Sequence, residues 1–183
     1  MVVKLVKLAR NICENNLEQI LQLNKYKREL DGHTYDYWGK EHVLKELPRK
    51  WDSSYLAFDN DKLIGFMISY LKSPDELRMS KICVLAKYRN LGIGTLLFKK
   101  FIEYAKENNI KKATTCTANF NHGMQRFLER NNFTRTFTWE SLEKITYYNY
   151  EMDLTVSEKH VHIKRGELLE GRKDYYRESR HRH

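Results

Sequence analysis

Hydrophobic positions between residues 3 and 154 follow two spacings in turn, one typical of strands and one typical of helices. Stretches rich in β-branched and aromatic residues predict strands at 3–8, 54–58, 62–71, 77–85, 112–118, 133–139 and 144–154. Apolar residues repeated every three or four positions predict helices near 17–23 and over 40–47, 95–108 and 121–130. Strands and helices that alternate in this way indicate an α/β fold.

The composition changes after Leu154. Residues 155–183 contain eight Lys or Arg, five Asp or Glu and four of the seven histidines, with few hydrophobic residues. We therefore expect one folded domain at 1–154 and a charged C-terminal extension at 155–183. Basic residues beside Tyr175 and Tyr176 would suit a nucleic-acid backbone, but the interspersed acids favour a solvated segment.

Charge and composition exclude some classes of protein without selecting one. The net charge of +9 favours anionic partners, including nucleic acid and phosphate-rich small molecules. No apolar run approaches the roughly 18 residues of a membrane helix, and the N-terminal residues do not match a signal peptide. Cys13, Cys83 and Cys116 match neither a zinc spacing nor a disulfide framework, so we expect no metal site and a cytoplasmic location.

The segment with the clearest chemistry is Arg89-Asn90-Leu91-Gly92-Ile93-Gly94, which lies between an apolar strand and an amphipathic helix. Such a turn directs main-chain N–H groups toward one point at the positive end of the helix dipole, which favours phosphate. The two glycines allow a ligand to approach the backbone closely, and the arginine adds a positive charge. A dinucleotide fingerprint would need a glycine in place of Leu97, and the Walker Gly-Lys-Ser/Thr is absent.

This turn resembles the Arg/Gln-x-x-Gly-x-Gly/Ala motif of the GNAT (Gcn5-related) N-acetyltransferase superfamily. The likeness includes the strand at 81–85 and continues at residues 121–133, whose sequence is Asn-His-Gly-Met-Gln-Arg-Phe-Leu-Glu-Arg-Asn-Asn-Phe. It implies a central, mixed, mostly antiparallel sheet of six to seven strands, flanked by about four helices. It also implies a function, the transfer of an acetyl group from acetyl-CoA to a primary amine that attacks directly.

The resemblance further implies a binding site for acetyl-CoA. In the family, the strand before the turn separates from its neighbour and binds the pantetheine arm, here through Cys83, Val84 and Leu85. Main-chain amides beside Arg89 would hold the pyrophosphate, and these belong to Asn90, Leu91, Gly92, Ile93, Gly94 and Thr95. Asn121, at the start of the next helix, would contact the pantetheine arm.

The residue that donates a proton to the leaving thiolate is not evident. Leu128 stands where family members often have a tyrosine. The sequence offers Tyr147, Tyr148 and His122 as substitutes, but strand packing is the favoured explanation of the two tyrosines and a solvated helix start that of His122.

The residue that accepts a proton from the amine is also open. Arg78 stands where some family members have a glutamate, and Glu76, two residues earlier on the same strand face, is the predicted base. Without a base, proximity of amine and thioester would still promote transfer. A covalent role for Cys83 or Cys116 is an alternative to their simple packing in the core.

The acceptor is expected to enter between residues 26–51 and 139–148. Aromatic and acidic residues there would suit a cationic amine, namely Tyr35, Asp36, Tyr37, Trp38, Glu41, Trp139, Glu140 and Glu143. Two other functions stay open: acetylation of an amine linked to nucleic acid, such as aminoacyl-tRNA, and coenzyme A binding without catalysis. A monomer and a homodimer fit the sequence equally well.

Overall fold

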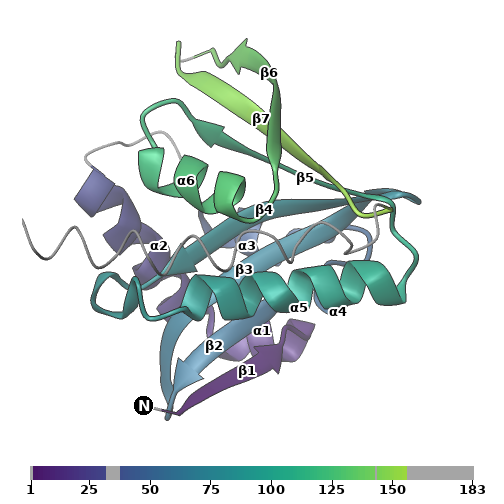
Figure 1. Ribbon diagram of the computed structural model, residues 1–183. Helices are drawn as coiled ribbons and strands as arrows, with labels where there is room; N and C mark the ends of the chain where they lie inside the picture. The colour runs from purple at the N-terminus through teal and green to yellow at the C-terminus, as the bar shows by residue number, and fades with distance from the viewer. Residues whose placement is uncertain (1, 32–37, 143, 156–183) are drawn as a thin grey trace, which may run out of the picture.

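A seven-stranded sheet forms the centre of the computed structural model, which describes residues 2–31, 38–142 and 144–155 (Figure 1). The strands are β1 (Val3–Lys7), β2 (Tyr55–Asp59), β3 (Lys62–Ser73), β4 (Glu76–Val84), β5 (Lys112–Ala118), β6 (Thr134–Glu140) and β7 (Thr146–Asp153). Their order across the sheet is β1-β2-β3-β4-β5-β7-β6, and every neighbouring pair is antiparallel except β4 and β5. The predicted mixed, mostly antiparallel sheet is therefore confirmed.

Helices cover both faces of this sheet. One face carries α5 (Ile93–Glu107) and α6 (His122–Arg130), and the other carries α1 (Arg10–Asn15), α2 (Leu17–Asp31) and α3 (Lys40–Leu44) (Figure 1). The short α4 (Lys50–Ser53) and the 3-10 turn η1 (Ala86–Tyr88) complete the helices of the described residues. None of these helices has the length and apolar character needed to cross a membrane.

A hydrophobic cluster lies on each face of the sheet. Beneath α5, Leu97 and Phe101 are fully buried, and on the opposite face Ile20 and Leu56 are fully buried beneath the N-terminal helices. The middle strand β3 is buried without interruption from residue 63 to residue 69. A strand covered on both faces reads as a continuous apolar run, which is why the sequence predicts it well.

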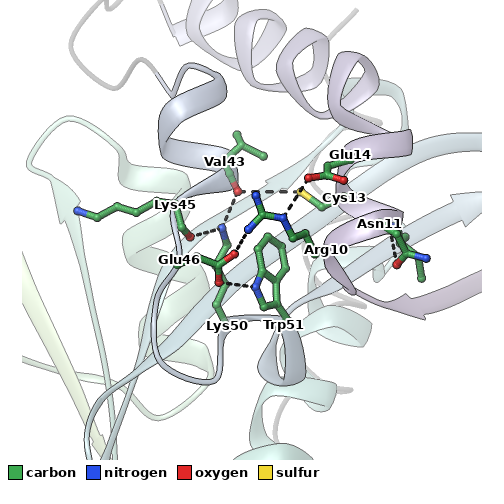
Figure 2. A network of polar contacts seen from close by, with 10 residues as sticks. Arg10, Asn11, Cys13, Glu14, Val43, Lys45, Glu46, Lys50 and Trp51 are labelled. Atoms are coloured by element: carbon green, nitrogen blue, oxygen red, sulfur yellow. Dashed lines mark hydrogen bonds and ion pairs between the residues drawn. The ribbon is translucent and has the colours of Figure 1, made fainter.

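The chain before β2 departs from the sequence prediction. The short helices α1 and α4 are absent from that prediction, and the predicted helix over 40–47 is wrong beyond Leu44, because Lys45 is extended at φ −54° and ψ 128°. Lys50 accounts for this early end. Its ammonium donates to the carbonyls of Val43, at 2.5 Å, and Lys45, at 2.7 Å (Figure 2). It thereby pairs carbonyls that a longer helix would have bonded internally.

Lys50 is fully buried and belongs to a network that joins α1 to α4. Its ammonium lies 4.2 Å from the centroid of the Trp51 ring, and the Trp51 indole N–H donates to Glu46 at 2.7 Å. Glu46 also pairs with Arg10 of α1 (Figure 2). Burial lowers the pKa of Lys50, although the charges of Cys13 and Glu46 act in the opposite direction.

Candidate functional site

The parallel strands β4 and β5 are paired over only part of their length. Glu76–Arg78 pair with Lys112–Thr114, although both strands continue past these residues. One side-chain contact follows, in which the Thr115 hydroxyl donates to the Met79 carbonyl at 2.8 Å. Beyond it the strands diverge (Figure 1). The separated strands expected from the resemblance are therefore present.

A cleft of about 770 Å³ lies beside the diverging strands, bounded by β4, the turn before α5, and α6. Nine of the eleven predicted cofactor residues line it: Cys83, Val84, Arg89, Asn90, Gly92, Ile93, Gly94, Thr95 and Asn121. Leu85 and Leu91 are not among the lining residues, and the Leu91 side chain is 55% exposed.

Sequence reasoning missed several residues of the cleft, namely Ile82, Tyr88, Gly123, Met124, Phe127, Arg130 and Asn131. A signal for part of this set was present, because Met124, Phe127 and Asn131 are spaced three and four residues apart. Residues at that spacing share one face of a helix. Since Asn121 is predicted to line the site, the same helix face predicts Met124, Phe127 and Asn131 as well.

The N-terminus of α5 presents main-chain donors to the cleft. Its first internal hydrogen bond joins the Leu96 N–H to the Gly92 carbonyl at 2.9 Å, and Gly92 provides no side-chain cap. The N–H groups of Ile93, Gly94 and Thr95 consequently have no partner within the helix, and all three residues line the cleft. Together with the positive end of the helix dipole, they are suited to an anion.

The two glycines of the turn differ in what they allow. Gly92 has a φ of 83°, and a Cβ there would meet nothing within 4 Å, so the conformation rather than the space requires glycine. A Cβ at Gly94 would lie 3.6 Å from Phe127 and 3.9 Å from Val84, two residues that line the cleft. An alanine at 94 therefore fits, whereas a longer side chain would extend into the cleft.

The main chain of β4 faces the opening at alternate residues. The Leu85 N–H donates to the Ile64 carbonyl of β3 at 2.8 Å, so this amide is directed away from the opening. The Val84 carbonyl points the other way and accepts from Arg89 Nε at 3.3 Å. Because main-chain groups alternate along an antiparallel strand, Ile82 shares the direction of Val84, and Cys83 that of Leu85.

The charged residues that line the cleft are all positive among those the structure describes. They are Arg89 and Arg130, and the lining includes no acidic side chain. The Tyr88 hydroxyl donates to Asp59 at 2.9 Å, which attaches η1 to β2 and positions the chain just before Arg89. The cleft therefore suits an anionic ligand.

No proton donor is found at the position of the family tyrosine. Leu128 is fully buried in the core beneath α6. The three substitutes, Tyr147, Tyr148 and His122, are not among the described residues that line the cleft. The Tyr147 ring stacks on Trp139 with centroids 4.6 Å apart, and Arg135 lies 4.4 Å from the Tyr148 ring.

Glu76, the predicted base, lies at the paired end of β4 rather than in the cleft. It is 8% exposed and accepts hydrogen bonds from Thr114 at 2.7 Å and Lys72 at 3.0 Å, with Lys112 at 3.6 Å. Burial alone would raise the pKa of Glu76, but these hydrogen bonds and the two lysine charges lower it overall. A carboxylate so stabilised accepts protons poorly. Its base role stays a prediction, and the contacts favour a structural ion pair.

The expected acceptor site is described only in part. Tyr35, Asp36, Tyr37 and Glu143 lie outside the described residues, as do residues 156–183 of the expected extension. Within the described part, Lys81 lies 5.5 Å from the Trp38 ring centroid, on the face of the sheet opposite α5 and α6. Trp139, on β6, is 41% exposed.

Comparison with known proteins gives a consistent result. The family described as "Acetyltransferase (GNAT) family" matches residues 16–133. An uncharacterized N-acetyltransferase of Methanocaldococcus jannaschii is 28% identical over 133 residues, covering 68% of this chain. The chain spans only 59% of the length of that relative.

Two solved structures show the same fold at low sequence identity. The PaiA N-acetyltransferase of Thermoplasma acidophilum, in complex with coenzyme A, is 17% identical with a TM-score of 0.68, and the match covers 84% of this chain and 99% of that one. The ribosomal-protein-S18-alanine N-acetyltransferase of Escherichia coli is 11% identical with a TM-score of 0.68, covering 87% and 98%.

Proposed function

Because the chain belongs to the GNAT acetyltransferase family, we propose that it transfers an acetyl group from acetyl-CoA to a primary amine by direct attack of the amine. One observation carries this proposal. The cleft combines a positive helix N-terminus with a strand whose main chain is exposed where β4 and β5 diverge. These two parts match the two chemical halves of coenzyme A, a charged phosphate group and an uncharged amide-containing arm.

The residues present fit coenzyme A. The amides of Ile93, Gly94 and Thr95 are available for the pyrophosphate, and Arg89 and Arg130 add positive charge. The main-chain groups of Val84 and Ile82 are directed as a pantetheine arm with amide groups requires. Met124 and Phe127 offer apolar surface beside that arm.

When bound, acetyl-CoA would supply the thioester that the amine attacks, and the protein would align the two reactants. Alignment of this kind lowers the barrier by several kcal/mol, of the order of 7–11 kcal/mol in favourable cases. The amine is expected to arrive from the face of α1–α3, opposite α5 and α6. The Escherichia coli neighbour is named for an alanine of a ribosomal protein, which makes peptide α-amines a natural part of any acceptor screen.

Calorimetry with acetyl-CoA and a thiol-release assay test the proposal. The amine panel contains small amines, peptides with free α-amines, and aminoacyl-tRNA, the last because of the +9 charge. We expect binding to the protein and thiol release with at least one amine. Absence of binding contradicts the proposal, and binding without release for any amine leaves a coenzyme A-binding module.

A matched pair of variants at Gly94 tests the location of the site. Gly94→Leu should remove acetyl-CoA binding, because its side chain would extend between Phe127 and Val84, while Gly94→Ala should retain most of it. Thermal melting of both variants serves as the control for folding. Equal affinities of the two variants would place the ligand elsewhere.

A further inference from the structure

A cysteine and an arginine meet where the parallel strands begin to separate. Arg78 is the last residue of β4 paired with β5, and Cys116 lies two residues past the last paired residue of β5. The Arg78 Nη2 donates to Cys116 Sγ at 3.1 Å. Cys116 is half-buried and not in a disulfide. This contact lies at the apex of the opening, on the face of the sheet opposite the cleft.

A guanidinium hydrogen-bonded to a cysteine sulfur stabilises the thiolate relative to the thiol. Reactive cysteines are found in partly exposed, electropositive surroundings of this kind, whereas structural ones are buried. The other two cysteines are of the buried type: the thiols of Cys13 and Cys83 donate to main-chain carbonyls, at 4.0 Å and 3.7 Å. Cys116 is therefore the cysteine whose setting matches a reactive thiolate.

Other titratable groups lie on the same face of the sheet as Cys116. The registers of β3, β4, β5 and β7, with the irregularity after Met79, place these described titratable residues on the same face: Tyr70, Lys72, Glu76, Lys81, Lys112, Tyr147, Glu151 and Asp153. Three carboxylates are among them: Glu76 binds Lys72 and Lys112, Glu151 lies 3.8 Å from Lys112, and Asp153 accepts hydrogen bonds from Thr155. Each carboxylate thus has a partner of its own, and Arg78 is a cation in hydrogen-bond contact with the sulfur.

We propose that Cys116, held as a thiolate by Arg78, is the proton acceptor for the attacking amine; this rests on the proposed function. The lone pair of the amine forms the bond to the acetyl carbon. The N–H bond breaks, its proton passes to Sγ, and its electron pair stays on nitrogen as the new lone pair. The thioester C–S bond breaks, and its electron pair leaves with the thiol sulfur. Cys116 then returns the proton to that departing thiolate, so no further reactant is required.

The first test measures the reactivity of the Cys116 sulfur as a function of pH, in the absence of acetyl-CoA. The rate of iodoacetamide alkylation is measured against pH, with peptide mass spectrometry to separate Cys116 from the other cysteines. For wild type the midpoint should lie at lower pH than for Arg78→Met, by at least about one pH unit. Arg78→Lys, which retains a positive charge, should lie between them. Identical midpoints for wild type and Arg78→Met overturn the proposal.

The second test reads catalysis. Cys116→Ala should lower kcat by roughly 10²-fold or more and remove the acid limb of the pH–rate profile, with acetyl-CoA affinity unchanged. Cys116→Ser serves if the alanine variant fails to fold. An unaltered profile in either folded variant overturns the proposal, as does acetylated Cys116 in protein given acetyl-CoA alone, which would mean covalent catalysis. If acetyl-CoA does not bind at all, the proposed function fails while the alkylation result still stands.

Discussion

At the scale of the residue, Lys50 illustrates how one buried donor fixes the path of the chain. Its ammonium, on a fully buried side chain, pairs the buried carbonyl of Val43 and the part-buried carbonyl of Lys45. Removing the donor leaves the buried Val43 carbonyl unsatisfied, which is more costly than the loss of an ordinary surface contact.

Lys50→Met should therefore reduce the free energy of unfolding by about 1–3 kcal/mol, even though methionine is of similar length and suits a buried site. Urea denaturation measures the change. Lys45→Met is the matched control, because it removes the same charge from an exposed side chain and leaves its main-chain carbonyl in place. Equal stabilities of the two variants would mean that the carbonyl contacts carry little weight.

Gly92 is the second residue with a specific conformational requirement. Gly92→Ala should cost about 1–2 kcal/mol of stability, because an L-residue is strained at a φ of 83° while no atom obstructs its Cβ. Gly92→Asn should lose less, since asparagine tolerates this region. Chemical denaturation of both variants distinguishes strain from steric clash, which would instead penalise the larger asparagine more.

At the scale of the element, the paired end of β4 and β5 depends on a carboxylate. Glu76 has a pKa below its unfolded value, so it stabilises the fold above the unfolded pKa, and this contribution disappears as pH falls through the lowered folded pKa. Wild type should therefore lose more stability on acidification from neutral pH to about pH 3 than Glu76→Gln does. Urea midpoints at both pH values measure this difference.

Glu140→Gln is the control for that comparison, because Glu140 is exposed on β6. It should behave as wild type does at both pH values. A loss on acidification that is the same in wild type and Glu76→Gln would contradict the stabilising role of the Glu76 carboxylate.

The elements differ in how far the sequence determines them. Long apolar strands such as β3, and the amphipathic α5, follow from local periodicity and are predicted nearly to their ends. The short α1 is not, because only Cys13 among its residues is buried and no side chain caps it. The end of α3 depends on Lys50, six residues past Leu44, and periodicity carries no information about such a contact.

The same distinction applies to the candidate site. The turn at 89–94 is a local motif, and five of its six residues line the cleft as the motif predicts. The contact between Arg78 and Cys116 joins residues 38 positions apart and depends on the register of two parallel strands. The direction of the Ile82 main-chain groups, toward the opening between β4 and β5, likewise depends on how β4 pairs with β3.

At the scale of the whole molecule, the net charge of +9 and the arginines of the cleft act on a polyanionic ligand together. Acetyl-CoA affinity should fall as salt rises from about 0.01 M to about 1 M, because the Debye length shrinks from about 30 Å to about 3 Å. Arg130→Gln should weaken binding and flatten this dependence. Calorimetry over the salt series measures both effects.

Arg126→Gln is the matched control, because Arg126 is exposed on the same helix and does not line the cleft. It changes the net charge equally but should affect affinity less. If the two variants lose equal affinity, the net charge alone governs binding and the position of Arg130 has no special importance.

Strands β4 and β5 are paired at one end only, and this pairing affects the width of the cleft beside them. A change in the angle between β4 and β5 at this paired end would displace the far end of β5, together with β7 paired along it, more than the paired residues. The width of the cleft would then depend on residues that do not line it. Substitutions around Glu76 would then change the affinity for the ligand although these side chains do not line the cleft.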